Sequence, residues 1–312
     1  MHLGSAALGF VCAVALLLSP RALRAQPTQK LDAKQGSGEA LGRAVKEAVT
    51  QSPPSAKSDL GYWSRGNARW FLSTRSELGT PYVKPYFSAG YGLPHWFWVG
   101  ADVNAIVTPE FAQGYFGVRA ASPVLDLAFG WRDTASFLKP LLEPKPSYLR
   151  EDVIEARGAR AHYWAWEAEA VAILPLPHAA LVGDFVVVHT LDVPQGRWLY
   201  DESYRAVVAS STFGVIRGVA VARLLHEDAL KAGVLGEVVL GTGRGKPVTR
   251  FGPVIALQIT DHLEAVGALS LSTSSPDELG LSLGAYGVCG LRYRWATGES
   301  DPKAPWSGEL IP

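Results

Sequence analysis

From residue 61 to residue 298, the sequence alternates apolar and polar side chains with a period of two. The stretch HWFWVGADVNAIV at 95–107 shows both the pattern and an anomaly, because Asp102 and Asn104 interrupt an otherwise apolar run. Alternate side chains of a β-strand point to opposite faces, so these two polar groups share one face. The pattern therefore predicts strands with one apolar face and one face that water can reach.

We count about twelve such segments, most of them close to the ten-residue length of a tilted membrane-spanning strand. They lie near 67–76, 82–91, 95–107, 111–121, 124–133, 157–173, 179–191, 204–224, 232–241, 250–260, 262–272 and 279–296. The segment 204–224 is long enough to contain a bend. No stretch after the N-terminal region has about 18 consecutive apolar residues, so we expect no transmembrane helix there.

The connections between these segments alternate in length. With the N-terminus in the periplasm, the periplasmic turns are short, and the two longest connections, 134–156 and 192–203, lie outside. Short periplasmic turns and long outer loops are typical of outer-membrane barrels. The short turns are at 92–94, 122–123, 175–177, 225–231 and 261–262.

The N-terminal region differs in composition from the rest of the chain. Residues 1–25 contain an unbroken apolar core and predict a signal peptide cleaved after Ala25. Residues 26–60 predict a periplasmic linker with a short helix, residues 61–298 the β-domain, and residues 299–312 a C-terminal tail. Cleavage leaves Cys289 as the single cysteine, so no internal disulfide is expected.

These features resemble bacterial outer-membrane β-barrel proteins as a class, over residues 61–298. The resemblance implies an all-β fold: a closed antiparallel transmembrane barrel of about twelve strands, in the outer membrane and in contact with its lipid. It also implies girdles of aromatic side chains at the two rims. The rim candidates are Phe97, Trp131, Trp164, Trp166 and Trp295. The alternative is a soluble periplasmic β-barrel or β-sandwich that binds a ligand, with its apolar residues inside.

In a membrane barrel, the polar face of each strand lines the lumen. The polar residues that the alternation places there are Asp102, Asn104, Arg119, Asp126, Arg132, Glu167, Glu169, Glu237, Glu264 and Arg292. Asp102, Arg119 and Asp126 come from three consecutive strands and predict an ion-pair network. Such a network could set the charge selectivity of a pore for small polar solutes, or it could fill a narrow structural barrel.

Other chemistry has weak support in the sequence. The loop-like LGTGRGKPVT at 240–249 lacks the glycine spacing and the Ser or Thr of a phosphate-binding loop. Glu167 and Glu169 favour a lumen ladder over a pair of catalytic carboxylates. His189 has Leu191 where an outer-membrane hydrolase would place its serine, and the histidines show no metal-ligand spacing. We therefore expect neither an enzyme nor a metal or cofactor site.

Charge and loop composition bear on partners. The 29 basic and 29 acidic residues give a net charge of zero, so we expect no nucleic-acid partner, which would need a basic surface. The long loops 134–156 and 192–203 carry aromatic and charged residues, so they could fold into the barrel or bind a partner at the cell surface.

Overall fold

The computed structural model describes residues 62–64, 66–154, 161–191, 193–209, 211–224 and 229–298. The predicted signal peptide, linker and C-terminal tail lie outside the described residues. Within those ranges the regular structure is almost entirely β-strand, and no helix there is long and apolar enough to cross a membrane. The short helices are η2 (Tyr62–Ser64), α3 (Arg150–Ile154) and α4 (Gly280–Gly284).

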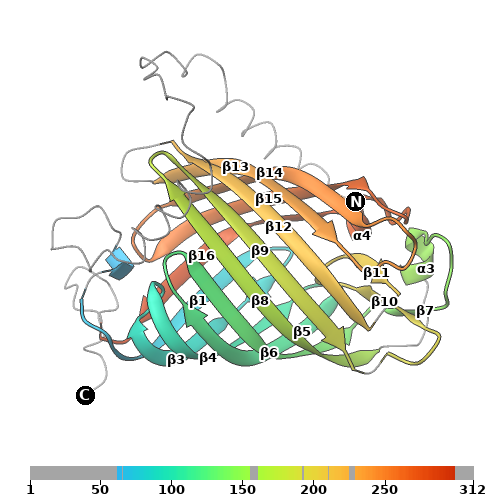
Figure 1. The fold of residues 1–312 in the computed structure, drawn as a ribbon, viewed down its shortest axis with the longest axis horizontal. Helices are drawn as coiled ribbons and strands as arrows, with labels where there is room; N and C mark the ends of the chain where they lie inside the picture. The colour runs from blue at the N-terminus through green and yellow to red at the C-terminus, as the bar shows by residue number, and fades with distance from the viewer. Residues whose placement is uncertain are drawn as a thin grey trace, which may run out of the picture. The chain divides into compact units, whose positions relative to one another are not determined.

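The main sheet closes on itself as a β-barrel (Figure 1). Every neighbouring pair is antiparallel, and β16 pairs with β1 to complete the ring. The sheet has thirteen assigned strands, but β2 and β3 both lie between β1 and β4 and act as one interrupted strand, so the barrel has twelve. The strands are β1 (Arg69–Thr80), β2 (Val83–Lys84), β3 (Tyr86–Leu93), β4 (Phe97–Val107), β5 (Phe111–Ala121), β6 (Leu125–Ser136), β8 (His162–Leu176), β9 (Ala179–Thr190), β12 (Thr212–Arg223), β13 (Leu230–Val239), β14 (Val248–Gln258), β15 (Leu263–Ser274) and β16 (Tyr286–Ala296).

The alternation in the sequence is the alternation between the two faces of this barrel. In β4, Val99 and Val103 point outward and are exposed, whereas Trp98 and Asp102 point inward and are buried. A closed ring leaves no unpaired strand edge, so the strand backbones satisfy their hydrogen bonds within the sheet. The outer face is apolar along most strands. Asp102 interrupts the apolar run in the sequence because its side chain lies on the inner face.

The two ends of the barrel differ. At the first, which we call the turn end, consecutive strands are joined by the short connections 94–96, 122–124, 177–178, 224–229 and 259–262. The start of β1 and the end of β16 also lie there. At the second, the loop end, the connections 137–161 and 191–211 are the longest within the barrel. This is the alternation of lengths predicted from the sequence.

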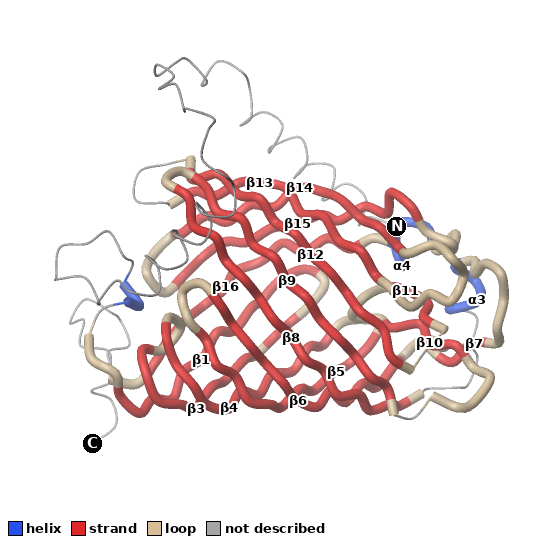
Figure 2. The backbone as a smooth tube through the Cα atoms, in the orientation of Figure 1, coloured by secondary structure: helices blue, strands red, loops and turns tan. Residues whose placement is uncertain are grey.

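Part of the connection 191–211 folds into the lumen. Strands β10 (Trp198–Asp201) and β11 (Ala206–Val208) form a hairpin, and β7 (Leu141–Leu142) adds a third strand to it. Side chains of the hairpin pack in one buried cluster with inward residues of β8, β9, β12, β13 and β14. We call residues 198–208 the plug. It fills this side of the barrel at the loop end, where Figure 2 shows β7, β10 and β11 together with α3 and α4.

A second buried cluster joins the plug to the other loops. Tyr148, Tyr200 and Leu283 pack together there with residues of β7, α3 and β11. Arg244 binds both oxygens of Asp277, with its Nη2 at 2.9 Å from Oδ2, and Asp277 also accepts the backbone N–H of Tyr148. The loops at this end therefore form one packed cap.

Two of the predicted strands were wrong at their N-terminal ends. Within 204–224, residues 206–208 belong to the plug, and the barrel strand starts at Thr212. Within 279–296, residues 280–284 form α4, and the strand starts at Tyr286. Both segments carry closely spaced apolar residues, and Val207, Val208 and Leu283 among them are buried in the two clusters at the loop end.

Candidate functional site

A polar cavity of about 590 Å³ lies inside the barrel. On β5 it is lined from Gln113 to Ala121, which is about 27 Å of extended chain and roughly 20 Å along the axis of a barrel with tilted strands. At the turn end it reaches His95 and Trp96, and toward the loop end it reaches Ser203 of the plug. The cavity therefore follows most of the height of the strands.

The predicted network of Asp102, Arg119 and Asp126 forms on one wall of this cavity. Arg119 donates from Nε to Asp102 at 2.9 Å and from Nη1 to Asp126 at 2.8 Å. Its Nη2 reaches Glu169 on β8 at 3.2 Å. The Tyr86 hydroxyl donates to the same Asp102 oxygen. One arginine thus forms ion pairs with three carboxylates, so acidic side chains outnumber basic ones in this network.

The paired glutamates of β8 go to different arginines. Glu169 binds Arg119, whereas Glu167 accepts from Arg132 Nη1 at 3.3 Å and from the Tyr204 hydroxyl of the plug at 3.1 Å. Arg132 is fully buried and also binds Asp201 of the plug. Glu167 therefore serves as an anchor for the plug, a role that the sequence did not reveal.

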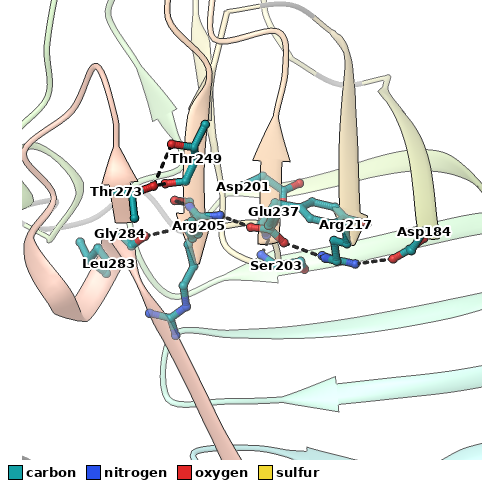
Figure 3. A network of polar contacts seen from close by, with 12 residues as sticks. Asp184, Asp201, Ser203, Arg205, Arg217, Glu237, Thr249, Thr273, Leu283 and Gly284 are labelled. Atoms are coloured by element: carbon teal, nitrogen blue, oxygen red, sulfur yellow. Dashed lines mark hydrogen bonds and ion pairs between the residues drawn. The ribbon is translucent and has the colours of Figure 1, made fainter. Parts of the chain in front are cut away.

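A chain of ion pairs continues around the wall toward β14 (Figure 3). Arg217 donates to Asp184 at 3.0 Å and to Glu237 at 2.7 Å. Arg250 binds the other oxygen of Glu237, and it donates to the backbone oxygen of Arg205 in the plug at 2.6 Å. The Glu237 side chain is completely buried between two arginines.

The wall formed by β1, β2, β15 and β16 has an excess of basic side chains. Arg292 binds Glu77 at 2.8 Å and Glu264 at 3.0 Å, and Arg294 shares Glu264 at 3.2 Å. Arg75 and Lys84 also line the cavity here, and neither makes an ion pair within the described residues. Four cations thus meet two carboxylates. Sequence reasoning proposed Glu264 and Arg292 but missed Arg75 and Lys84. Barrel closure brings Arg75 on β1 beside β16, and Lys84 reaches the same wall because β2 pairs with β1.

The remaining sequence candidates are placed individually. Asn104 lines the cavity. Phe97 lies on the outer face at the turn end, where Trp295, the residue before the last of β16, also lies. On the outer face toward the loop end, Trp131 is directly opposite Trp166 across the β6–β8 pair, and Trp164 is exposed nearby.

Of the groups outside the barrel strands that have displaced pKa values, one lies in the plug and one at the mouth of the cavity. Burial raises the pKa of Glu202 in the plug to about 7, and the neighbouring Asp201 charge acts in the same direction. Burial lowers the pKa of His95, in a turn at the other end, to about 3, and the charges of Arg75 and Arg294 add to that shift. His95 is therefore neutral at the mouth of the cavity.

The structure gives no support for the enzymatic alternatives. His189 bonds to the Thr212 hydroxyl at 2.6 Å and stacks on Trp166, and Leu191 occupies the place of a serine. Residues 240–247 form a loop between β13 and β14 with no helix after it. No group of His, Cys, Asp or Glu among the described residues is arranged to hold a metal ion.

Apolar side chains face outward around a ring of strands, and charged side chains face a cavity within it. The chain has the architecture of an outer-membrane β-barrel. A soluble β-sandwich would keep its strand edges open and its apolar residues inside, so this alternative does not fit the closed fold.

Comparisons with known proteins found similarity only among solved structures, since no family model and no curated protein matches the sequence. KdgM porin is 7% identical with a TM-score of 0.39, covering 72% of this chain and 98% of the porin. A loop-deletion mutant of OmpT, an outer membrane protein of Vibrio cholerae, is 10% identical with a TM-score of 0.35, covering 73% and 99%. The translocator domain of autotransporter NalP from Neisseria meningitidis is 11% identical with a TM-score of 0.30, covering 82% and 95%. The assignment to the barrel class therefore rests on the strand register, the closure and the apolar outer face.

Proposed function

We propose that this protein is a pore of the bacterial outer membrane that passes small polar solutes. In this proposal the apolar outer face contacts lipid, the turn end faces the periplasm and the packed cap faces the outside. The supporting observation is the polar cavity of about 590 Å³, which follows the β1–β6 wall from the turn end to the plug. A barrel that served only as a scaffold would have its lumen filled by paired side chains.

The plug sets the expected size limit of the pore. It occupies the side of the lumen formed by β8, β9, β12, β13 and β14, so only the opposite side is left for solutes. Its contacts with Arg132 and Glu167 hold it in the lumen. We therefore expect a conductance well below that of an open twelve-stranded barrel, with passage limited to small solutes.

Conductance across a planar lipid bilayer tests the proposal. Refolded protein, verified by heat-modifiable migration on a gel, should give stable ohmic steps, and a heat-denatured sample from the same preparation should give none. Silence from verified folded barrels would contradict the pore. It would favour the second candidate, a structural or surface-binding barrel that uses the loops 134–156 and 192–203, whose described parts form the packed cap.

A further inference from the structure

Two arginines face each other where the barrel closes. Arg75 on β1 and Arg294 on β16 are direct partners in the strand register, and both line the cavity. Directly opposed residues on antiparallel strands have Cβ atoms about 5 Å apart, and like charges in such positions destabilise the sheet. A register of this kind is favourable only when something neutralises the pair.

The two carboxylates on this wall neutralise only part of the charge: Arg294 shares Glu264 with Arg292, and Arg75 forms no ion pair within the described residues. Glu77 gives one oxygen to Arg292 at 2.8 Å and the other to the Tyr82 hydroxyl at 2.8 Å. Glu264 uses a single oxygen for both Arg292 and Arg294. Lys84 is the register partner of Glu77 but makes no ion pair or hydrogen bond within the described residues. The wall therefore keeps an excess of positive charge beside the cavity.

The carboxylates across the lumen share Arg119, and none of them forms an ion pair with Arg75 or Arg294 within the described residues. Asp126 and Glu169 both bind Arg119, at 2.8 and 3.2 Å. The Arg75 guanidinium lies 4.7 Å from the centre of the Tyr86 ring, a cation–π contact that fixes its position but does not cancel its charge. Arg75 is therefore held in place with its hydrogen-bond donors free within the described part of the chain.

We propose that Arg75 and Arg294, with Lys84 deeper in the lumen, form a binding site for the oxyanion group of a small solute, a carboxylate or a phosphate. This inference rests on the proposed pore and adds to it the chemical class of its solute. A guanidinium presents paired donors that match the two oxygens of such a group, and the site lies beside the path that a solute would take.

Calorimetric titration of the folded, detergent-solubilised full chain tests the site, with inorganic phosphate and acetate as separate probes at fixed ionic strength. At least one probe should bind to the native chain. Binding of acetate indicates a carboxylate solute, and binding of phosphate indicates a phosphate solute. Arg75→Gln should weaken that binding roughly tenfold or more, since it removes a charged hydrogen-bond donor pair. Lys246→Gln removes a positive charge from an exposed loop and should leave the binding unchanged.

A second measurement, the unfolding midpoint, distinguishes loss of the binding site from misfolding of the variant. Saturating probe should raise the unfolding midpoint of the native chain but not that of Arg75→Gln, whereas Arg75→Gln without probe should be no less stable than the native chain. Absence of binding to the native chain, or equal binding by Arg75→Gln and Lys246→Gln, overturns the site. Bilayer conductance is scored separately. If folded barrels bind a probe but do not conduct, the proposed pore is wrong and the oxyanion site stands. If they conduct but bind neither probe, the oxyanion site is wrong and the pore stands.

Discussion

Arg119 donates from Nε to Asp102 over 2.9 Å, so an arginine on β5 neutralises the aspartate that interrupts the apolar sequence of β4. The Asp102 side chain is completely buried, and the Tyr86 hydroxyl shares the same oxygen. An acidic residue at this position is therefore part of an internal network, and its neighbour Val103 faces the opposite way.

Asp102→Asn should destabilise the barrel by roughly 1–3 kcal/mol, because the amide keeps the shape but removes a charged acceptor from a buried network. Arg119 keeps Asp126 and Glu169, which limits the loss. Urea unfolding in detergent or lipid vesicles measures the change. Asp261→Asn, in an exposed turn, is the matched control and should have little effect. Equal stability of the two variants would show that the network contributes nothing.

Val103→Arg should destabilise folding into bilayers by about 2–4 kcal/mol, because it places a charge in the hydrocarbon at mid-strand. Val103 is 49% exposed on the outer face, so no packing inside the barrel is disturbed. The folded fraction in lipid vesicles, read from heat-modifiable migration, measures the effect. Val103→Leu keeps an apolar side chain and should fold normally. A folded fraction for Val103→Arg that matched Val103→Leu would argue against lipid contact at this face.

Asp201→Ala should loosen the plug and give larger, more variable conductance steps. Asp201 binds Arg132 through one oxygen, and through the other it accepts the backbone N–H groups of Ser203 at 3.0 Å and Tyr204 at 3.1 Å. The substitution leaves those donors without their acceptor. Single-channel recording compares it with Glu143→Ala, a charge removal at an exposed position outside the lumen. Identical steps from both variants would mean that the plug does not restrict the pore.

Glu202 should make the barrel more stable in mild acid than in mild base. Its pKa is raised from 4.5 to about 7 by burial, and its neighbours are Asp201 and the Tyr163 hydroxyl, at 3.0 Å. A raised pKa in the folded state means that the stabilisation is fully present below about pH 4.5 and is lost as the pH rises through 7. The loss is on the order of 3 kcal/mol. Denaturant midpoints at pH 5 and pH 8 measure it, and Glu202→Gln should remove most of the difference. A difference that persists in Glu202→Gln must come from other groups.

The sequence predicted the barrel well because its strands are long and each has one apolar side, which faces outward in the structure. The register of Asp102, Arg119 and Asp126 followed from two short turns, so local spacing was enough to bring them together. Residues 206–208 and 280–284 were assigned to barrel strands because a buried hairpin strand and a short helix in a packed cap also carry closely spaced apolar residues. Short apolar runs do not distinguish these cases.

The excess of basic residues on the wall formed by β1, β2, β15 and β16 was missed for another reason. Arg75 and Arg294 are neighbours only because the first and last strands pair, and strand number and stagger decide their register. Barrel closure depends on the number and stagger of all the strands, so the sequence around either arginine does not reveal this pairing. The roles of Glu167 and Arg132 as anchors of the plug depended in the same way on a loop that returns to the lumen.

Site-specific labelling tests the central claim, that the apolar face contacts lipid and the polar face encloses a water-filled lumen. A fluorophore on a cysteine at Val103 and one at the inward Ser88, each in a Cys289→Ser background, are compared in vesicles that contain a lipid-borne spin-label quencher. The account predicts strong quenching at position 103 and little at position 88, where a water-soluble quencher should act instead. Fluorescence at position 103 that is indifferent to the lipid-borne quencher, in barrels verified as folded, would contradict the account.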